Sequence, residues 1–207
     1  MKEQNYLKVL VEDIHSVVIA TVDKNGLPFS RVIDMMLYDE NGIYFLTAHG
    51  KVFFEQLQYK PYISLSGITT GADTMRRKSI SLSGAVRNIG SMRRDEIFEK
   101  NPYMNDIYLS DASRIALDVF CLYKGNGDFF DLSTKPITRR QFSFGGESLK
   151  RYGYQITNDC NSCGLCQTKC PQDCILSGTP FKIVQENCLH CGNCFEICPI
   201  DAIEKLG

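Results

Sequence analysis

Before residue 142, short apolar segments alternate with polar turn signals, a pattern typical of a β-sheet. Asn-Gly pairs at residues 25–26 and 41–42 separate three of these segments and indicate hairpin turns. The pattern predicts strands at residues 15–22, 27–38, 43–48, 62–68, 78–89, 114–125 and 128–133. The last two are expected to form a hairpin around Gly-Asn-Gly at residues 125–127.

Three segments in the same region favour helices instead. Residues 1–15 space their apolar positions as an amphipathic helix does, and residues 51–59 predict a short helix that ends before Pro61. A third helix is expected from Ser91, which can cap its N-terminus. This balance of strands and helices predicts an α+β fold, a small barrel with helical decoration.

A different pattern takes over after a seam at residues 142–155, where two glycines and a basic pair suit a linker. Residues 160–175, CNSCGLCQTKCPQDCI, align with residues 188–203, CLHCGNCFEICPIDAI, at a period of 28 with eight of sixteen positions identical. Such a repeat indicates two copies of one unit packed about a pseudo-twofold axis. Two domains are therefore expected, at residues 1–145 and 146–207.

The cysteines of each repeat follow the spacing C-x2-C-x2-C-x3-C-P. Three thiolates at i, i+3 and i+6 can hold one face of a four-iron cluster from a single tight loop. The fourth Cys is expected to open a short helix, with Pro in its first turn, and to reach the other loop's cluster. This predicts one 4Fe–4S cluster on Cys160, Cys163, Cys166 and Cys198, and a second on Cys188, Cys191, Cys194 and Cys170. Gly164 and Gly192 would let the backbone pass close to the inorganic sulfide.

With this spacing, residues 150–207 resemble the bacterial two-cluster ferredoxins. The alternatives are a zinc site or a degraded cluster site, although a zinc ribbon uses paired CxxC knuckles and four ligands. A disulfide framework would leave an odd thiol. Cys174 aligns with Ala202 and is interpreted as a spare buried thiol, because eight other cysteines already satisfy two clusters. Cys121 lies outside the repeats, in an apolar segment that predicts a buried strand position.

Composition and charge narrow the class of protein. The chain has 207 residues, of which 43% are hydrophobic, and a formal net charge of −1, so nothing indicates a nucleic-acid or polybasic membrane surface. Its longest apolar run, within HSVVIATV, is too short to span a bilayer, and the N-terminus lacks the pattern of a secretory signal. We therefore expect a cytoplasmic protein with no nucleic-acid or membrane partner.

The stretches ATVDKNGLPFSRVIDMMLY and GIYFLTAHGKVFFEQLQYKPYISLSG resemble the FMN-binding split barrels of the pyridoxamine 5′-phosphate oxidase-like family, over about residues 10–135. The resemblance implies an FMN phosphate site on Arg31, Thr47 and Lys51, with His49 as a helper. It implies further flavin contacts at Ile33, Asp34, Leu46, Ser64 and Ser66. Independently of the family, a strand end followed by a basic residue at a helix N-terminus combines charge with free N–H groups, which suits an anion. The resemblance also implies a homodimer, because a second subunit would cover the flavin groove.

The sequence departs from the true oxidases at two places. It has no Lys near Met35 or Met36, and the cysteine repeats occupy the end of the chain where those enzymes use Arg and His for pyridoxal phosphate. Vitamin B6 oxidation is therefore not expected. Related barrels bind haem or a deazaflavin, and both stay open as alternatives to FMN.

The two halves together predict a flavin and iron–sulfur oxidoreductase that moves electrons between two 4Fe–4S clusters and FMN. A small molecule would react at the flavin, and the electron donor or acceptor would be a protein or a small molecule. The alternatives are a non-enzymatic electron carrier or redox sensor, and a haem-binding barrel. No acid–base or nucleophile constellation is recognisable in the sequence, as expected if a cofactor carries the chemistry.

Overall fold

A computed structural model describes residues 3–207 and divides the chain into two compact units. The first comprises the chain up to Thr70, Ser79–Gly127 and Phe142–Ser148, and the second comprises Gly71–Lys78, Asp128–Gln141 and Leu149–Gly207. The units interleave along the sequence, so no single cut separates them. The boundary after residue 145 stays a prediction for the limits of the two sequence domains.

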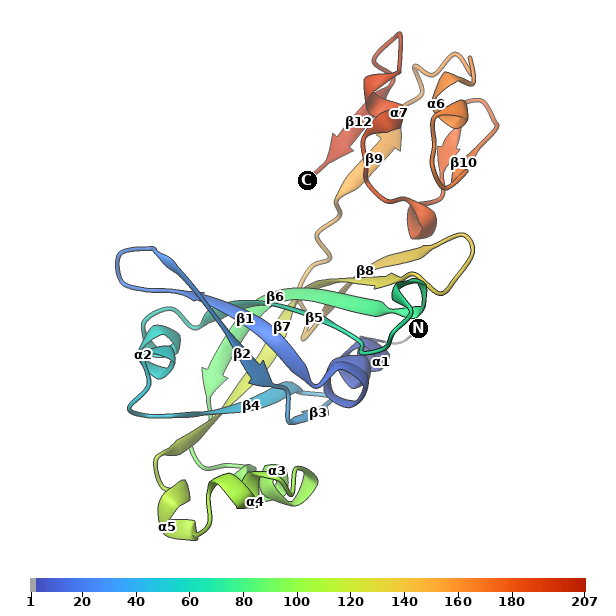
Figure 1. The fold of residues 1–207 in the computed structure, drawn as a ribbon. Coiled ribbons are helices and arrows are strands. Elements are labelled where there is room, and N and C mark those ends of the chain that lie inside the picture. Colours follow the sequence, from blue (N-terminus) through green and yellow to red (C-terminus); the bar gives the residue numbers. More distant parts are fainter. Residues whose placement is uncertain (1–2) are drawn as a thin grey trace. The chain divides into compact units, whose positions relative to one another are not determined.

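An eight-stranded sheet forms the framework of the first unit, with the strand order β2-β1-β5-β6-β7-β4-β3 and β8 paired with β7 (Figure 1). The strands are β1 (Ser16–Val22), β2 (Pro28–Asp34), β3 (Leu37–Asp39), β4 (Gly42–Ala48), β5 (Tyr62–Ile68), β6 (Lys78–Asn88), β7 (Leu117–Asp131) and β8 (Thr138–Phe144). Side chains alternate across it: in β5, Ile63 and Leu65 are buried whereas Ser64 and Ser66 are exposed.

Helices accompany this sheet at the three predicted places, residues 3–14, 52–59 and 94–100, and also at residues 74–76, 104–107 and 111–114, where none was predicted. They are α1 (Glu3–Lys8), the π-helix η1 (Val9–Ile14), α2 (Val52–Tyr59), α3 (Arg94–Lys100), α4 (Met104–Ile107), α5 (Asp111–Arg114) and the 3-10 turn η2 (Thr74–Arg76). The predicted helix at residues 1–15 is present from Glu3, and Met1 and Lys2 lie outside the described residues. None of the helices between residues 3 and 207 is long and apolar enough to cross a membrane.

The prediction of one strand over residues 27–38 is wrong, because the chain changes partners in the middle. Up to Asp34, β2 pairs with β1, and the Met35 amide still donates to the His15 carbonyl at 2.8 Å. The Met36 amide instead donates to the Tyr44 carbonyl at 2.9 Å, and β3 continues alongside β4. The break carries the chain from β2, at one end of the strand order, to β3, at the other end. Both methionines at the break are buried.

The predicted hairpin turn at residues 125–127 is also wrong. β7 runs without interruption through Gly125 to Asp131, and its partner β8 follows a turn at residues 132–137. A Cβ on Gly125 would lie 2.4 Å from the carbonyl oxygen of Ser83. Glycine is therefore needed here for close strand contact rather than for a turn.

The second unit contains the repeat as two small two-stranded sheets. Its elements are β9 (Gly153–Ile156), α6 (Leu165–Thr168), β10 (Ile175–Leu176), β11 (Lys182–Ile183), the 3-10 turn η3 (Gln185–Asn187), α7 (Asn193–Glu196) and β12 (Ile203–Leu206). The strand after each repeat pairs with the strand before the other, β10 with β11 and β12 with β9. Isoleucines, Phe181 and several cysteines share one buried core between them.

Candidate functional site

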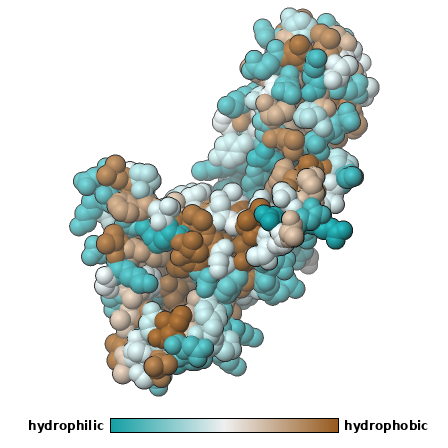
Figure 2. Space-filling model, in the orientation of Figure 1, coloured by the Kyte–Doolittle hydropathy of each residue, from teal (hydrophilic) through white to brown (hydrophobic). Residues whose placement is uncertain are grey.

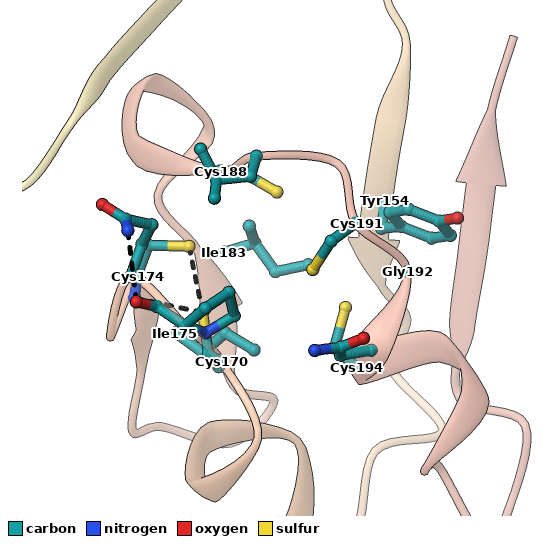
Figure 3. A pocket seen from close by; sticks show the side chains of 13 residues that line it. Tyr154, Cys170, Cys174, Ile175, Ile183, Cys188, Cys191, Gly192 and Cys194 are labelled. Atoms are coloured by element: carbon teal, nitrogen blue, oxygen red, sulfur yellow. Dashed lines mark hydrogen bonds between the residues drawn. The ribbon is translucent and has the colours of Figure 1, made fainter. Parts of the chain in front are cut away.

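Nine cysteines line two cavities in the second unit. One cavity is lined by Cys160, Cys163, Cys166 and Cys198. The other is lined by the predicted ligands Cys170, Cys188, Cys191 and Cys194, and also by Cys174 (Figure 3). Each set takes three cysteines from one repeat and the fourth from the other, which is the same division that the spacing predicts.

The donor chemistry of these cavities fits iron–sulfur clusters. Among the described residues, no three His, Cys, Asp or Glu side chains converge closely enough to hold a single metal ion. The four sulfurs of each set instead line a separate cavity, with no other ligand type among the lining residues. Such all-cysteine sets are the ligands of 4Fe–4S clusters, although ligation by these eight residues stays a prediction.

The backbone around the sulfurs repeats with the sequence. Gly164 and Gly192 precede α6 and α7 with φ of +82° and +84°, a conformation that favours glycine. Four backbone amides donate to cysteine sulfurs at repeat-related positions: Ser162 to Cys160 at 3.4 Å, His190 to Cys188 at 3.4 Å, Cys174 to Cys170 at 3.4 Å, and Ala202 to Cys198 at 3.3 Å. Each cavity is therefore ready to stabilise negative charge on its thiolates.

The fourth cysteine reaches the other cavity by a different route from the predicted one. The short helices α6 and α7 end before Cys170 and Cys198, so the prediction that each fourth Cys opens a helix is wrong. After Pro171 the chain turns into β10, which pairs with β11 a few residues before Cys188. The strand pairing, rather than a helix, holds Cys170 beside the second repeat.

Cys174 is a fifth sulfur in the second cavity. It lines that cavity, its exposed fraction is 5%, and its Sγ lies 3.4 Å from the Sγ of Cys170 (Figure 3). Burial, together with the sulfurs of Cys170 and Cys188, raises the pKa of Cys174 well above the ordinary thiol value. Its predicted burial is confirmed, as is that of Cys121 in β7.

A hairpin segment that the sequence did not assign to the cysteine repeats contacts the second cavity. This arm, residues 128–141, belongs to the second compact unit. Arg139 pairs with Asp128 and donates to the Leu189 carbonyl at 3.0 Å. Asn187 donates to the Ile137 carbonyl at 3.0 Å. The arm thus fixes the backbone beside Cys188, and local sequence carries no signal for these long-range bonds.

In the first unit, Arg31 lies against helix α2. Its guanidinium donates to Thr21 Oγ1 at 2.7 Å and to Gln56 Oε1 at 2.8 Å. It also lies 4.4 Å from the centre of the Phe53 ring. Burial lowers the pKa of Arg31. These contacts join β2 to α2 and place the Arg31 guanidinium against the helix that follows Lys51.

Two buried polar atoms near α2 have no partner within the described chain. Thr47 at the end of β4 is 3% exposed, and its Oγ1 makes no hydrogen bond; neither does the Nε2 of Gln56. Lys51 immediately precedes α2, and its side chain does not cap the helix; its carbonyl accepts the Phe54 amide at 2.9 Å. Two unpartnered polar atoms and two cations around this helix fit an anionic group such as a phosphate.

The remaining predicted flavin residues do not all join this group. His49 has its Nε2 3.0 Å from the Asp118 carboxylate. Leu46 is buried in a separate apolar cluster with residues such as Tyr44 and Val119. Ile33 lies on the same face of β2 as Arg31. Asp34, Ser64 and Ser66 lie on the opposite face of the sheet. Within one chain, the nine candidates therefore form no single pocket.

Asp34 instead belongs to a polar cluster that the sequence did not reveal. It accepts hydrogen bonds from Ser16 Oγ at 2.5 Å and from the Tyr103 hydroxyl at 2.7 Å. His15, with a φ of +63°, has its Nε2 3.1 Å from the Tyr103 hydroxyl. Burial tends to raise the pKa of Asp34, but the bonds from Ser16 and Tyr103 and the nearby His15 outweigh it and lower the pKa. Tyr103 is distant in sequence, so only the fold assembles this acid–base group.

Comparison with known families agrees with this architecture. The family model described as pyridoxamine 5′-phosphate oxidase matches residues 5–121. The chain belongs to this family. A 4Fe–4S dicluster domain matches residues 153–199, so the protein joins a pyridoxamine 5′-phosphate oxidase-like split barrel to a small ferredoxin-type domain. The predicted α+β fold class is confirmed.

Curated relatives cover only part of this combination. The pyridoxine/pyridoxamine 5′-phosphate oxidase of Escherichia fergusonii is 40% identical over 53 residues, which are 26% of this chain and 24% of that enzyme. The enzyme of Christiangramia forsetii is 28% identical over 92 residues, 44% of this chain and 41% of that enzyme. The chain thus spans less than half the length of the curated relatives it matches.

Solved structures resemble the split barrel. A NimC/NimA family protein from Clostridium acetobutylicum has a TM-score of 0.55 at 19% identity, covering 70% of this chain and 94% of that one. PhzG from Burkholderia lata, in complex with tetrahydrophenazine-1-carboxylic acid, has a TM-score of 0.52 at 17% identity, covering 71% of this chain and 87% of that one. At these identities the likeness shows the fold alone.

Proposed function

We propose that this protein is a flavin and iron–sulfur oxidoreductase that moves electrons between two 4Fe–4S clusters in the second unit and FMN in the barrel. The pair of cysteine-lined cavities on a chain with an oxidase-family barrel supports this proposal most strongly. When bound, FMN supplies a group that exchanges electrons singly with clusters and in pairs with an organic molecule. The cysteine-rich second domain, absent from the matched part of the oxidase relatives, favours an electron-transfer role.

The chain's own residues would bind and orient these groups. Lys51, Arg31 and the N-terminus of α2 would hold the FMN phosphate, because they combine two positive charges with the positive end of a helix dipole. Cysteine sulfurs would anchor the irons in both cavities.

The identity of the barrel's ligand is the first test of the proposal. Protein purified without oxygen should show flavin and iron–sulfur absorption, and acid treatment should release FMN that is identified by chromatography. A haem Soret band, or release of a deazaflavin, would contradict the FMN assignment. Neither result would by itself affect the assignment of the clusters.

Cluster-dependent turnover distinguishes an enzyme from an electron carrier. With a reduced two-cluster ferredoxin in continuous supply, the protein should reduce many equivalents of a quinone per chain. The double variant Cys163→Ala/Cys191→Ala should lose this activity while keeping FMN, because each cluster loses one of its four thiolates. Stoichiometric oxidation alone would favour an electron carrier, and undiminished turnover in the variant would contradict cluster-to-flavin transfer.

We also propose a homodimer that uses the exposed face of β2, β1 and β5. Val32 and Val18 are cross-strand neighbours on this face with exposed fractions of 70% and 50%, and Tyr62 and Ile68 extend the apolar surface. Figure 2 shows hydrophobic residues gathered over this part of the barrel. Exposed apolar patches of this kind mark interaction surfaces.

Val32→Glu should convert the dimer into a monomer, because it places a charge at the centre of an apolar interface. Light scattering on wild-type and variant protein measures the change. Ile107→Glu, at an equally exposed apolar position in α4, is the matched control and should stay dimeric. A wild-type monomer that binds FMN tightly would contradict this proposal.

A further inference from the structure

The two cysteine cavities are closely matched in their backbone. Each has two backbone amides that donate to cysteine sulfurs at positions 28 residues apart, with N–S distances of 3.3–3.4 Å. Asp173 precedes Cys174 and Asp201 precedes Ala202, and these two aspartates adopt positive φ values of 49° and 52°. The backbone around Cys174 and around Ala202 therefore has the same local conformation.

One side chain near the end of each repeat differs between the two cavities. Ala202 lines the first cavity and is 1% exposed, whereas the corresponding Cys174 lines the second cavity and is 5% exposed. The backbone amides of both residues donate to the fourth cysteine of their own repeat. Only Cys174 adds a sulfur, which lies 3.4 Å from the Sγ of Cys170.

We propose that Cys174 makes the two clusters inequivalent by donating an S–H hydrogen bond to the Cys170 sulfur, which raises the reduction potential of the second cluster above that of the first. As an iron ligand, Cys170 would be a thiolate and could only accept. Cys174 is not needed as a ligand and keeps its hydrogen. A donor beside a cluster sulfur stabilises the extra negative charge of the reduced state, and hydrogen bonds to the sulfurs are among the determinants of cluster potential.

This inequivalence sets the order of electron flow within the second unit. With the higher potential, the second cluster would hold a single electron that enters either cluster, and the first would act as its donor. The inference rests on the proposed binding of two clusters. It adds a direction of electron flow between the clusters, which the near-identical ligand sets alone do not determine.

The arm is a second difference between the cavities, and its effect on the potentials must be distinguished from that of the Cys174 thiol. The arm contacts the loop beside the second cavity through Arg139, which donates to the Leu189 carbonyl, and through Ile137, whose carbonyl accepts from Asn187. Its influence would persist in any variant of residue 174 or 202. Exchanging the thiol between the repeats therefore distinguishes the two causes.

The experiment is a potentiometric titration followed by electron paramagnetic resonance on anaerobically reconstituted wild type, Cys174→Ala, Ala202→Cys and the double variant. Wild type should show two separate potentials. In Cys174→Ala the higher potential should fall towards the lower one, and in Ala202→Cys the lower should rise towards the higher one. The double variant should restore a separation of similar size, because the donor has only changed repeats.

Conservative replacement and metal content complete the test. Cys174→Ser keeps a donor at the same place and should retain most of the wild-type separation. Iron is determined first in every variant, and about eight irons per chain show that both clusters are present. Wild-type protein with fewer irons would defeat the two-cluster proposal itself. A full complement of iron with an unchanged separation in Cys174→Ala would overturn the role of Cys174 and assign the difference to the arm.

Discussion

Cys170→Ala is expected to remove the second cluster and leave the first intact, reducing the iron content from about eight to about four per chain. Cys170 lines the second cavity with Cys188, Cys191 and Cys194, although it belongs to the first repeat by sequence. Loss of this one thiolate leaves a three-sulfur set that holds a four-iron cluster poorly. Iron and sulfide analysis after anaerobic reconstitution, together with paramagnetic resonance of the reduced protein, measures the result.

The matched control is Cys174→Ala, four residues further along the same turn. This variant should keep about eight irons, because two four-iron clusters need eight thiolates and the other eight cysteines of the repeats supply them. Cys198→Ala provides the symmetric test, since it should remove the first cluster and spare the second. Loss of a cluster in Cys174→Ala but not in Cys170→Ala would show that the ligand assignment is wrong.

Lys51→Glu is expected to weaken FMN binding by roughly ten- to a hundred-fold, the range that corresponds to losing one charge-assisted hydrogen bond. The substitution replaces a cation at the start of α2 with an anion that repels the phosphate. Titration of the flavin-free protein with FMN, followed by flavin fluorescence, gives the affinity. Iron content should be unchanged, because the cysteine cavities belong to the other unit.

Lys60→Glu is the matched control for this charge reversal. Lys60 is exposed and follows the last residue of the same helix, so the variant makes the same change of net charge away from the proposed phosphate site. Its affinity for FMN should remain close to that of the wild type. Equal affinities of the two variants would place the phosphate elsewhere in the barrel.

The cysteine repeats show which parts of a site can be predicted from sequence when the ligands lie within one loop. Cysteines three residues apart on one loop must face a common centre, so the spacing identifies the sets that Cys160 and Cys188 begin. The glycines before α6 and α7 follow from the same local geometry. The path of the fourth cysteine was not predictable in this way, because the long-range pairing of β10 with β11 places Cys170.

The barrel shows the same division between local and long-range information. Alternation in β5 and the apolar spacing of α2 are local properties, and both elements occur where the pattern predicts them. The turn predicted at residues 125–127 fails because glycine serves both turns and close strand contacts. Nothing in a single segment distinguishes these uses before the partner strand, here β6 at Ser83, is known.

The sequence by itself determined the strands and helices with clear periodicity, the two-part organisation and the three-cysteine loops, because each depends on residues within a few turns of one another. Tertiary structure alone decided which residues from distant segments meet. It brought Arg31 to Gln56, Tyr103 to Asp34, the arm to Leu189 and Cys174 into the second cavity. These contacts depend on the sheet order and on strand pairing over long separations, whose free energy is shared by the whole fold and leaves no signature in any one segment.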